Sequence, residues 1–379
     1  MTRETVFSNA RIVLGDRVMH GTVQVRDGRI AALATGGTML PGAIDLEGDF
    51  LLPGLVELHT DNLEKHFSPR PGVQWPSQPA AHSHDAQIAS AGITTTLDAI
   101  AIGDLHARPE RAERLAEAVR AIERGVEDGT LRAEHHLHLR CEICCADVIE
   151  MLDGFAAHPL VKLVSLMDHT PGQRQFVNID KFRTYYMGRY GYSAAEMDDF
   201  IERRTADQRR YGEAHRAAIV GICRERGHTI ASHDDATRAH VEEAAASGAV
   251  ISEFPTTIEA AAASHEHGLA VLMGAPNLVL GGSHSGNVSA MRLASEGLLD
   301  ILSSDYVPSS LLQGVFLLHR EGMNLPDAVA KASRNPARMV GLDDRGEIAE
   351  GKRADLLRVR ETPHGPIVRT VWREGQRII

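Results

Sequence analysis

Two side chains that can bind a metal ion close an apolar run near the start of this chain. Residues 55–61 read LVELHTD, so His59 and Asp61 lie two positions apart at the end of the run. On a β-strand, side chains at this spacing project from the same face. An imidazole beside a carboxylate suits a divalent ion, although a strand capped by a His–Asp hydrogen bond gives the same pattern.

The same kind of ending recurs farther along the chain. The further endings contain His138, Arg140 and Glu142, then Asp168 and His169, then His233 with Asp234 and Asp235, and finally Asp305. One strand ending in His or Asp is ordinary, but five of eight predicted strands ending this way indicate a shared site. In a barrel of parallel strands, the carboxyl ends of the strands meet at the catalytic face.

Imidazole and carboxylate groups are the ligand set of a borderline ion such as zinc, and two ions are possible if a carboxylate bridges them. A divalent ion lowers the pKa of a coordinated water toward about 7. A nearby carboxylate can then accept the proton, and Asp305 is the residue we predict for that role. We expect one or two divalent ions per chain, with zinc as the leading candidate.

Each of these residues also has a plainer interpretation. A single histidine at a strand end is more often hydrogen-bonded within the fold than bound to metal. Asp234 and Asp235 precede a helical pattern and would serve as caps. Asp234 would alternatively orient His233 from behind the ligand shell.

Two loop features suggest phosphate binding. Residues 281–287 form a glycine-rich loop containing His284 after the seventh predicted strand, a position that often cradles phosphate in barrels. Arg70 and Arg174 lie just beyond metal-bearing strands, where a guanidinium would clamp phosphate oxygens. The alternative for both arginines is a solvated loop side chain.

The middle of the chain alternates short apolar runs with helical patterns, which predicts βαβ units and a parallel sheet. The expected strands span residues 55–61, 94–100, 135–142, 160–169, 229–235, 250–254, 269–273 and 298–305. Helical patterns include 83–91, 109–125 and 237–246. Eight such units predict an α/β fold, a (β/α)8 TIM-type barrel.

Both ends of the chain read instead as short strands and turns. The expected strands are 4–14, 21–25, 29–33 and 43–51 at one end, and 354–359 and 367–372 at the other. We therefore predict a small β-sandwich domain from residues 1–52 and 346–379, and a catalytic barrel over 53–345. Segment 170–216 is long for a barrel connection and is predicted to be a functional insertion or lid, with a solvated surface helix favoured for 193–216.

Charge and hydropathy limit the classes of molecule that this chain is expected to bind. The net charge of −11 argues against binding to nucleic acid or to an anionic membrane surface. No run approaches the roughly 18 apolar residues of a membrane helix, and no export signal opens the chain, so we expect a cytoplasmic enzyme with a small-molecule substrate and a possible homo-oligomeric state. The four cysteines are expected to be buried thiols rather than a zinc site.

Several strings in the sequence resemble the amidohydrolase superfamily. The general ones are PGLVELH at 53–59 and GKRADL at 351–356, together with the β-rich ends. More specific strings are HTDNLEK at 59–65, HLHLRCE at 136–142, SLMDHTPGQRQF at 165–176, ASHDD at 231–235, GSHSGN at 282–287 and SSDY at 303–306. Over nearly the whole chain, these strings resemble a family of ribose 5-triphosphate diphosphatases of the bacterial carbon–phosphorus lyase pathway.

The resemblance implies specific roles. The family hydrolyses alpha-D-ribose 1-methylphosphonate 5-triphosphate to the 5-phosphate and pyrophosphate. The implied metal ligands are His59, Asp61, Glu142, His169, His233 and Asp305. The expected substrate-binding residues are Arg70, Arg140, Arg174 and His284, with Asp168 and Asp234 supporting the ligands.

One departure from the superfamily pattern affects the metal site. Many members carry His-x-His on the first strand and a carboxylated lysine as the bridge, whereas this chain has His-x-Asp and offers Glu142 as the bridge. Two other functions stay open at this point. One is hydrolysis of a cyclic amide or N-acyl substrate, and the other is a catalytically silent scaffold in a phosphonate-processing assembly.

Overall fold

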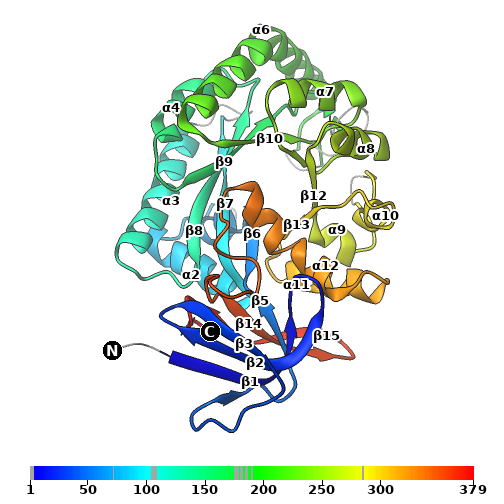
Figure 1. Ribbon diagram of the computed structural model, residues 1–379. Helices are drawn as coiled ribbons and strands as arrows, with labels where there is room; N and C mark the ends of the chain where they lie inside the picture. Colours follow the sequence, from blue (N-terminus) through cyan, green and yellow to red (C-terminus); the bar gives the residue numbers. More distant parts are fainter. Residues whose placement is uncertain are drawn as a thin grey trace.

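The computed structural model describes residues 4–70, 72–103, 109–174, 179, 182–183, 187–188, 191–283 and 286–379, with only the backbone for 109–112. Figure 1 shows a strand–helix barrel with a smaller β-rich layer against one end of it. The two chain ends both belong to that layer.

The barrel is built from eight parallel strands in sequence order. They are β6 (Leu55–Thr60), β7 (Ile93–Ile102), β8 (Glu134–Glu142), β9 (Val161–Met167), β10 (Thr229–His233), β11 (Ile251–Glu253), β12 (Ala270–Gly274) and β13 (Ile301–Ser303). A bridge between Thr60 and Asp305 joins the first strand to the chain just after the last. The predicted α/β TIM-type fold is confirmed.

Helices surround the strands (Figure 1). They are α1 (Asn62–Phe67), α2 (Ser77–Ser90), α3 (Pro109–Glu127), α4 (Val148–Ala156), α6 (Ala194–Arg226), α7 (Arg238–Ala246), α8 (Ile258–Glu266), α9 (Ala275–Val279), α10 (Ala290–Ser295), α11 (Ser310–Arg320), α12 (Leu325–Ala330) and α13 (Arg334–Met339). Their apolar faces pack on the outward side chains of the strands in two large cores. A separate cluster, including Leu97, Leu163 and Ile301, draws on the strands and on α13.

Strands from both chain ends form one mixed sheet. Its members are β1 (Glu4–Val13), β2 (Val18–Arg26), β3 (Arg29–Thr35), β4 (Ile44–Asp45), β5 (Phe50–Pro53), β14 (Leu356–Thr362), β15 (Gly365–Arg373) and β16 (Gln376–Arg377). Phe7 and Trp372 meet edge to face at 4.7 Å although two strands separate theirs in the sheet order. The sheet therefore curls around its own core. The boundaries of this unit remain a prediction.

The second half of the predicted insertion is helical. A capping box at Ser193 and Glu196 starts α6, because each residue's side chain accepts from the other's backbone N–H. Gly227, in the left-handed conformation, ends the helix. The helix is longer than expected and packs against α4. Much of 175–190 lies outside the described residues.

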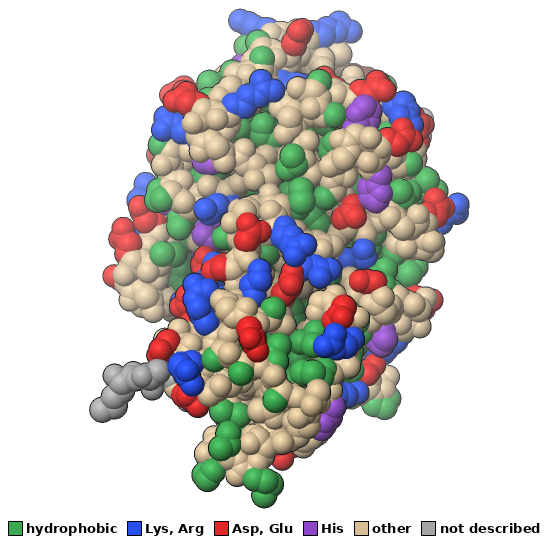
Figure 2. All heavy atoms as spheres, in the orientation of Figure 1, with side chains coloured by type: hydrophobic (Ala, Val, Ile, Leu, Met, Phe, Trp, Pro, Cys, Tyr) green, Lys and Arg blue, Asp and Glu red, His purple; other side chains and the backbone are tan. Residues whose placement is uncertain are grey.

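Two further expectations concern the whole chain. The four cysteines are free and buried, as predicted. No helix in the described part of the chain is long and apolar enough to cross a membrane. Acidic and basic side chains are interspersed over the face seen in Figure 2.

Candidate active site

Closure of the barrel brings the first predicted ligands together. The backbone N–H of Asp61 donates to the carbonyl of Asp305 at 3.0 Å, and the N–H of Asp305 donates to the carbonyl of His59 at 3.1 Å. Ligand atoms of these three residues lie within 4.8 Å of one another. We call this set the first triad (His59, Asp61, Asp305). His59 and Asp61 come from the start of the barrel sequence and Asp305 from its end, and the β6–β13 junction brings Asp305 to the other two.

A second triad lies beside the first. His169 follows β9, His233 ends β10 and Asp234 comes next. The Nε2 atoms of His169 and His233 lie 3.6 and 3.5 Å from one carboxylate oxygen of Asp234. The ring of His233 stacks on that of His59 with centroids 5.7 Å apart, so the two triads adjoin.

Backbone conformation places the carboxylates of both triads. Asp234 and Asp305 have φ values of 57° and 52°, in the left-handed region that non-glycine residues rarely adopt. The N–H of Asp234 donates to the carbonyl of Glu253 at 2.9 Å, which fixes the turn after β10. Such conformations cluster at functional sites, where the surrounding structure holds them.

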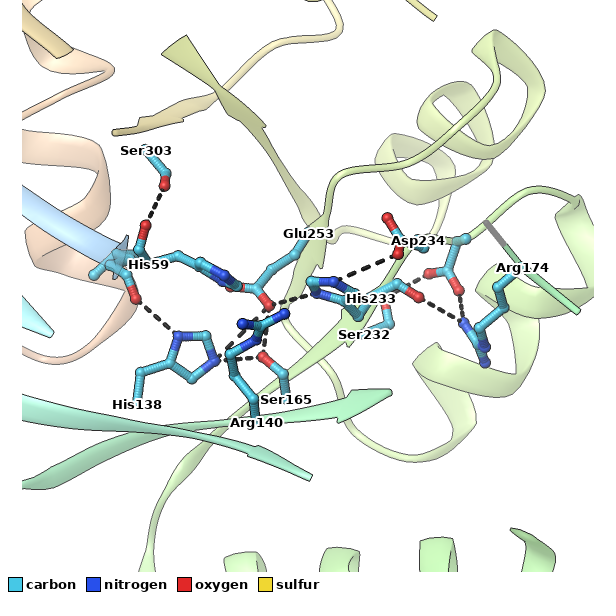
Figure 3. Close-up of polar contacts among 12 residues, drawn as sticks. His59, His138, Arg140, Ser165, Arg174, Ser232, His233, Asp234, Glu253 and Ser303 are labelled. Atoms are coloured by element: carbon cyan, nitrogen blue, oxygen red, sulfur yellow. Dashed lines mark hydrogen bonds and ion pairs between the residues drawn. The ribbon is translucent and has the colours of Figure 1, made fainter. Parts of the chain in front are cut away.

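A buried carboxylate, Glu253 at the end of β11, links the two triads. Its Oε1 lies 3.2 Å from Nδ1 of His59, and its Oε2 lies 3.3 Å from Nδ1 of His233. Ser165 donates to Oε2 at 2.6 Å, and Nε2 of His138 lies 2.5 Å from the Ser165 hydroxyl. Figure 3 shows these side chains converging between the strand ends.

Sequence reasoning missed Glu253 as a site residue. The predicted strand 250–254 ends in this carboxylate in the same way as its neighbours. Unlike Glu142, which shares its strand with His138, Glu253 ends a short run that contains no histidine or aspartate. Its position at the end of predicted strand 250–254 was the sequence signal that could have identified it.

The electrostatics of the site follow from burial and from these pairs. Burial alone would raise the pKa of Glu253, but His138 and His59 hold it well below its ordinary value. Burial and the neighbouring Asp61 carboxylate both raise the pKa of Asp305. Burial opposes protonation of His169, yet Glu142 raises its pKa to about 10. Adjacent carboxylates therefore differ in how readily they hold a proton.

The two triads fit a divalent ion by their donors and orientation. Because Glu253 accepts at Nδ1 of both His59 and His233, the Nε2 atoms face the carboxylates. A carboxylate behind an imidazole is the arrangement that orients metal-binding histidines. Imidazole nitrogen and carboxylate oxygen are ordinary ligands for zinc and similar ions. Either triad could hold an ion.

Glu142, the predicted bridge, contacts the second triad. Its Oε2 lies 2.6 Å from Nδ1 of His169, and its Oε1 accepts from the His169 backbone N–H at 2.9 Å. Ligand atoms of Glu142, Cys144 and Asp168 also lie within 4.8 Å of one another. Asp168 is buried and accepts from the backbone N–H of Thr170 at 3.0 Å, so it holds the turn after β9.

The predicted phosphate-binding residues are placed differently from one another. Arg140 lies in the site and donates to Asp61 at 2.7 Å, and its buried Nε has no hydrogen-bond partner among the described residues. Arg174 is buried behind His233, and its guanidinium pairs with Asp235 and, at 2.9 Å, with Glu243.

The other two predicted contacts lie in loops. Arg70 is exposed in a turn closed by a 3.0 Å hydrogen bond from Val73 to its carbonyl. His284 lies outside the described residues. Neither Arg70 nor Arg174, the two predicted clamp residues, contacts a triad carboxylate in the described structure, whereas Arg140, predicted only as a substrate-binding residue, lies beside Asp61.

Comparison with known proteins gives the relationships of the chain. Residues 50–378 match the model of the amidohydrolase family. The chain is 49% identical to the alpha-D-ribose 1-methylphosphonate 5-triphosphate diphosphatase of Escherichia coli K12, over 98% of this chain and 100% of the relative. It is also similar, at 35% identity over 102 residues, to a dihydroorotase of Methanopyrus kandleri, which is 22% of this chain and 24% of that protein.

Solved structures support the same fold. An N-acetyl-D-glucosamine-6-phosphate deacetylase from Mycobacterium smegmatis superposes with a TM-score of 0.66 at 18% identity, covering 99% of this chain and 100% of that chain. The corresponding enzyme from Pasteurella multocida gives a TM-score of 0.63 at 14% identity, covering 99% of each chain. At these identities the similarity shows the architecture alone.

Proposed function

The chain belongs to the amidohydrolase family, and we propose that it hydrolyses alpha-D-ribose 1-methylphosphonate 5-triphosphate to the 5-phosphate and pyrophosphate. The observation that carries this proposal is the 49% identity to the Escherichia coli diphosphatase over the full length of that relative. The long strings that include His59, His138, His169 and His233 lie at the strand ends that form the site.

The geometry supports hydrolysis at phosphorus. Phosphoanhydride cleavage requires positioning and charge neutralisation more than covalent chemistry from the protein. A divalent ion held by the two triads would supply an acidified water and positive charge against the phosphate oxygens. Two adjacent triads support two ions per chain, and their donor set supports zinc.

The protein's own residues account for the rest of the reaction. Asp305 accepts a proton at its carboxylate, because burial and Asp61 both raise its affinity for one. Glu253 keeps protons on Nδ1 of His59 and His233, which leaves Nε2 free to bind. Arg140 supplies a fixed positive charge for phosphate oxygens beside Asp61.

The test is pyrophosphate release. Purified protein loaded with Zn²⁺ is incubated with ribose 5-triphosphates, with and without the 1-methylphosphonate group, and products are followed by phosphorus NMR. We expect one pyrophosphate for each 5-phosphate formed. An Asp305→Asn preparation, purified in parallel, shows whether a contaminating phosphatase is responsible. Turnover of cyclic amides or N-acyl sugars in place of triphosphates would overturn the proposal.

A further inference from the structure

A second set of buried polar residues lies outside the barrel wall. His84 of α2, Asp98 of β7 and His135 of β8 are each fully buried. Nε2 of His84 lies 2.7 Å from Oδ1 of Asp98, and Nδ1 of His135 lies 2.8 Å from Oδ2 of the same carboxylate. Ile100 and Leu137 lie two positions after Asp98 and His135 on the same strands, so they share the same face, and both pack into the outer core. Asp98 and His135 are therefore in apolar surroundings.

On the side away from Asp61, His135 extends the hydrogen-bonded set to Asp85. Nε2 of His135 lies 3.4 Å from Asp85, and Asp85 accepts the backbone N–H groups of Arg132 and Ala133 at 2.8 and 2.9 Å. Although burial opposes it, the carboxylate of Asp98 and that of Asp85 raise the pKa of His135 to about 9. His135 is therefore a buried imidazolium between two carboxylates.

At the near end, the set reaches the active site. Nδ2 of Asn62 lies 3.0 Å from Nδ1 of His84, and the amide can only donate there. Nδ1 of His84 must then accept, which leaves its Nε2–H to donate to Asp98. Asn62 begins α1 and directly follows Asp61 of the first triad. Asp98 is paired with Thr60, the residue before Asp61.

Asp61 is thus held from two sides. Its own N–H is bound to Asp305 inside the barrel, and the next side chain is bound to His84 outside it. Asp61 makes no side-chain cap to α1, so its carboxylate is free to turn toward His59 and Arg140.

We infer that the chain His135–Asp98–His84–Asn62 is a positioning network, which holds Asp61 in place for metal binding from outside the barrel. The inference rests on the metal site of the proposed function. The ligand atoms of His84, Asp98 and His135 also lie within 4.8 Å of one another. A cation among them would displace two short hydrogen bonds and meet the positive charge on His135, so a positioning role fits better.

The test measures Zn²⁺ affinity by competition with a chromophoric chelator. We expect Asn62→Ala to weaken binding at least tenfold, which is the usual effect of removing a group that orients a ligand. His84→Gln is expected to do the same through the next link. Asn62→Ala leaves the buried Asp98 pair intact, so it is the variant expected to fold normally.

The control is Ile88→Val, which trims a buried side chain on the same helix. We expect Ile88→Val to lower the melting temperature and to leave Zn²⁺ affinity unchanged. Wild-type affinity in Asn62→Ala, or an equal loss in Ile88→Val, would overturn the inference. Pyrophosphate release by the wild type is scored separately. A wild type that binds Zn²⁺ without releasing pyrophosphate would remove the proposed function and leave this inference standing.

Discussion

Replacing Glu253 by Gln should separate the two triads from the carboxylate that orients them. Gln keeps one oxygen and gains an amino group that can only donate. Glu253 faces Nδ1 of His59 with one oxygen, and Nδ1 of His233 and the hydroxyl of Ser165 with the other. Whichever way the amide turns, one imidazole loses its acceptor and meets a donor.

The size of the effect follows from that loss. Removing a group that orients a metal-binding histidine weakens affinity about 10- to 100-fold, which corresponds to roughly 1.4 to 2.7 kcal/mol. Ser165→Ala removes a hydrogen bond to Glu253 and leaves both imidazoles paired, so its effect should be smaller. The expected order of Zn²⁺ affinity is wild type, then Ser165→Ala, then Glu253→Gln.

The assay is chelator competition at neutral pH, with the stoichiometry of bound metal measured on the same samples. Glu266→Gln is the matched control, because Glu266 is an exposed carboxylate on α8 that pairs with Arg238 at 2.6 Å. We expect this control to bind Zn²⁺ as the wild type does. Glu253→Gln with affinity within twofold of wild type would refute the role we assign to this carboxylate.

Three further predictions concern other parts of the protein. Asp305→Asn should retain metal and lower kcat about 10²- to 10⁴-fold; loss of metal would make Asp305 an essential ligand. Because Asp98 helps raise the pKa of His135 to about 9, protonated His135 stabilises the fold fully below about pH 6.5, and this stabilisation is lost as pH rises through 9. The unfolding free energy measured with urea should therefore fall by about 3 kcal/mol over this pH range, and an unfolding free energy that does not change with pH would contradict the prediction. Arg174→Ala leaves Asp235 buried without its partner and should lower the unfolding free energy by about 3 kcal/mol with KM unchanged. A raised KM at wild-type stability would instead support the hypothesis that Arg174 binds phosphate.

The barrel could be predicted from sequence because each strand is a short apolar run followed by a helical pattern. The strand boundaries were less certain. The expected strand 298–305 is observed as β13 (Ile301–Ser303), since Asp305 turns into the left-handed region instead of continuing the strand. A positive φ at a non-glycine residue carries no reliable signal in the sequence.

The site was predictable to the extent that strand ends meet at one face. His59, Asp61, His169, His233 and Asp305 come together as expected. Their pairing into two triads depends on backbone turns that the sequence does not reveal. Asp234, expected to support His233 from behind, joins His169 and His233 as a possible ligand because its φ is 57°.

The buried network outside the barrel could not be predicted by the same reasoning. Asp98 and His135 lie within their strands and not at the strand ends, so the pattern of His and Asp at strand ends does not include them. Arg174 illustrates a related limit. Its partners Asp235 and Glu243 are more than sixty positions away, and only the folded barrel makes the arginine a buried ion pair.

The charges of the site constrain the order in which ligands bind, if the substrate is a triphosphate. The carboxylates of Asp61, Asp234, Asp305 and Glu253 all lie within the electrostatic reach of one guanidinium, that of Arg140. Unit charges 4 Å apart interact by about 4 kcal/mol at an effective dielectric constant of 20. One arginine cannot offset this set and a polyanion together. We therefore expect divalent ions, where they bind at the two triads, to bind before the phosphate chain, and the carboxylate of Asp61 adds to this expectation.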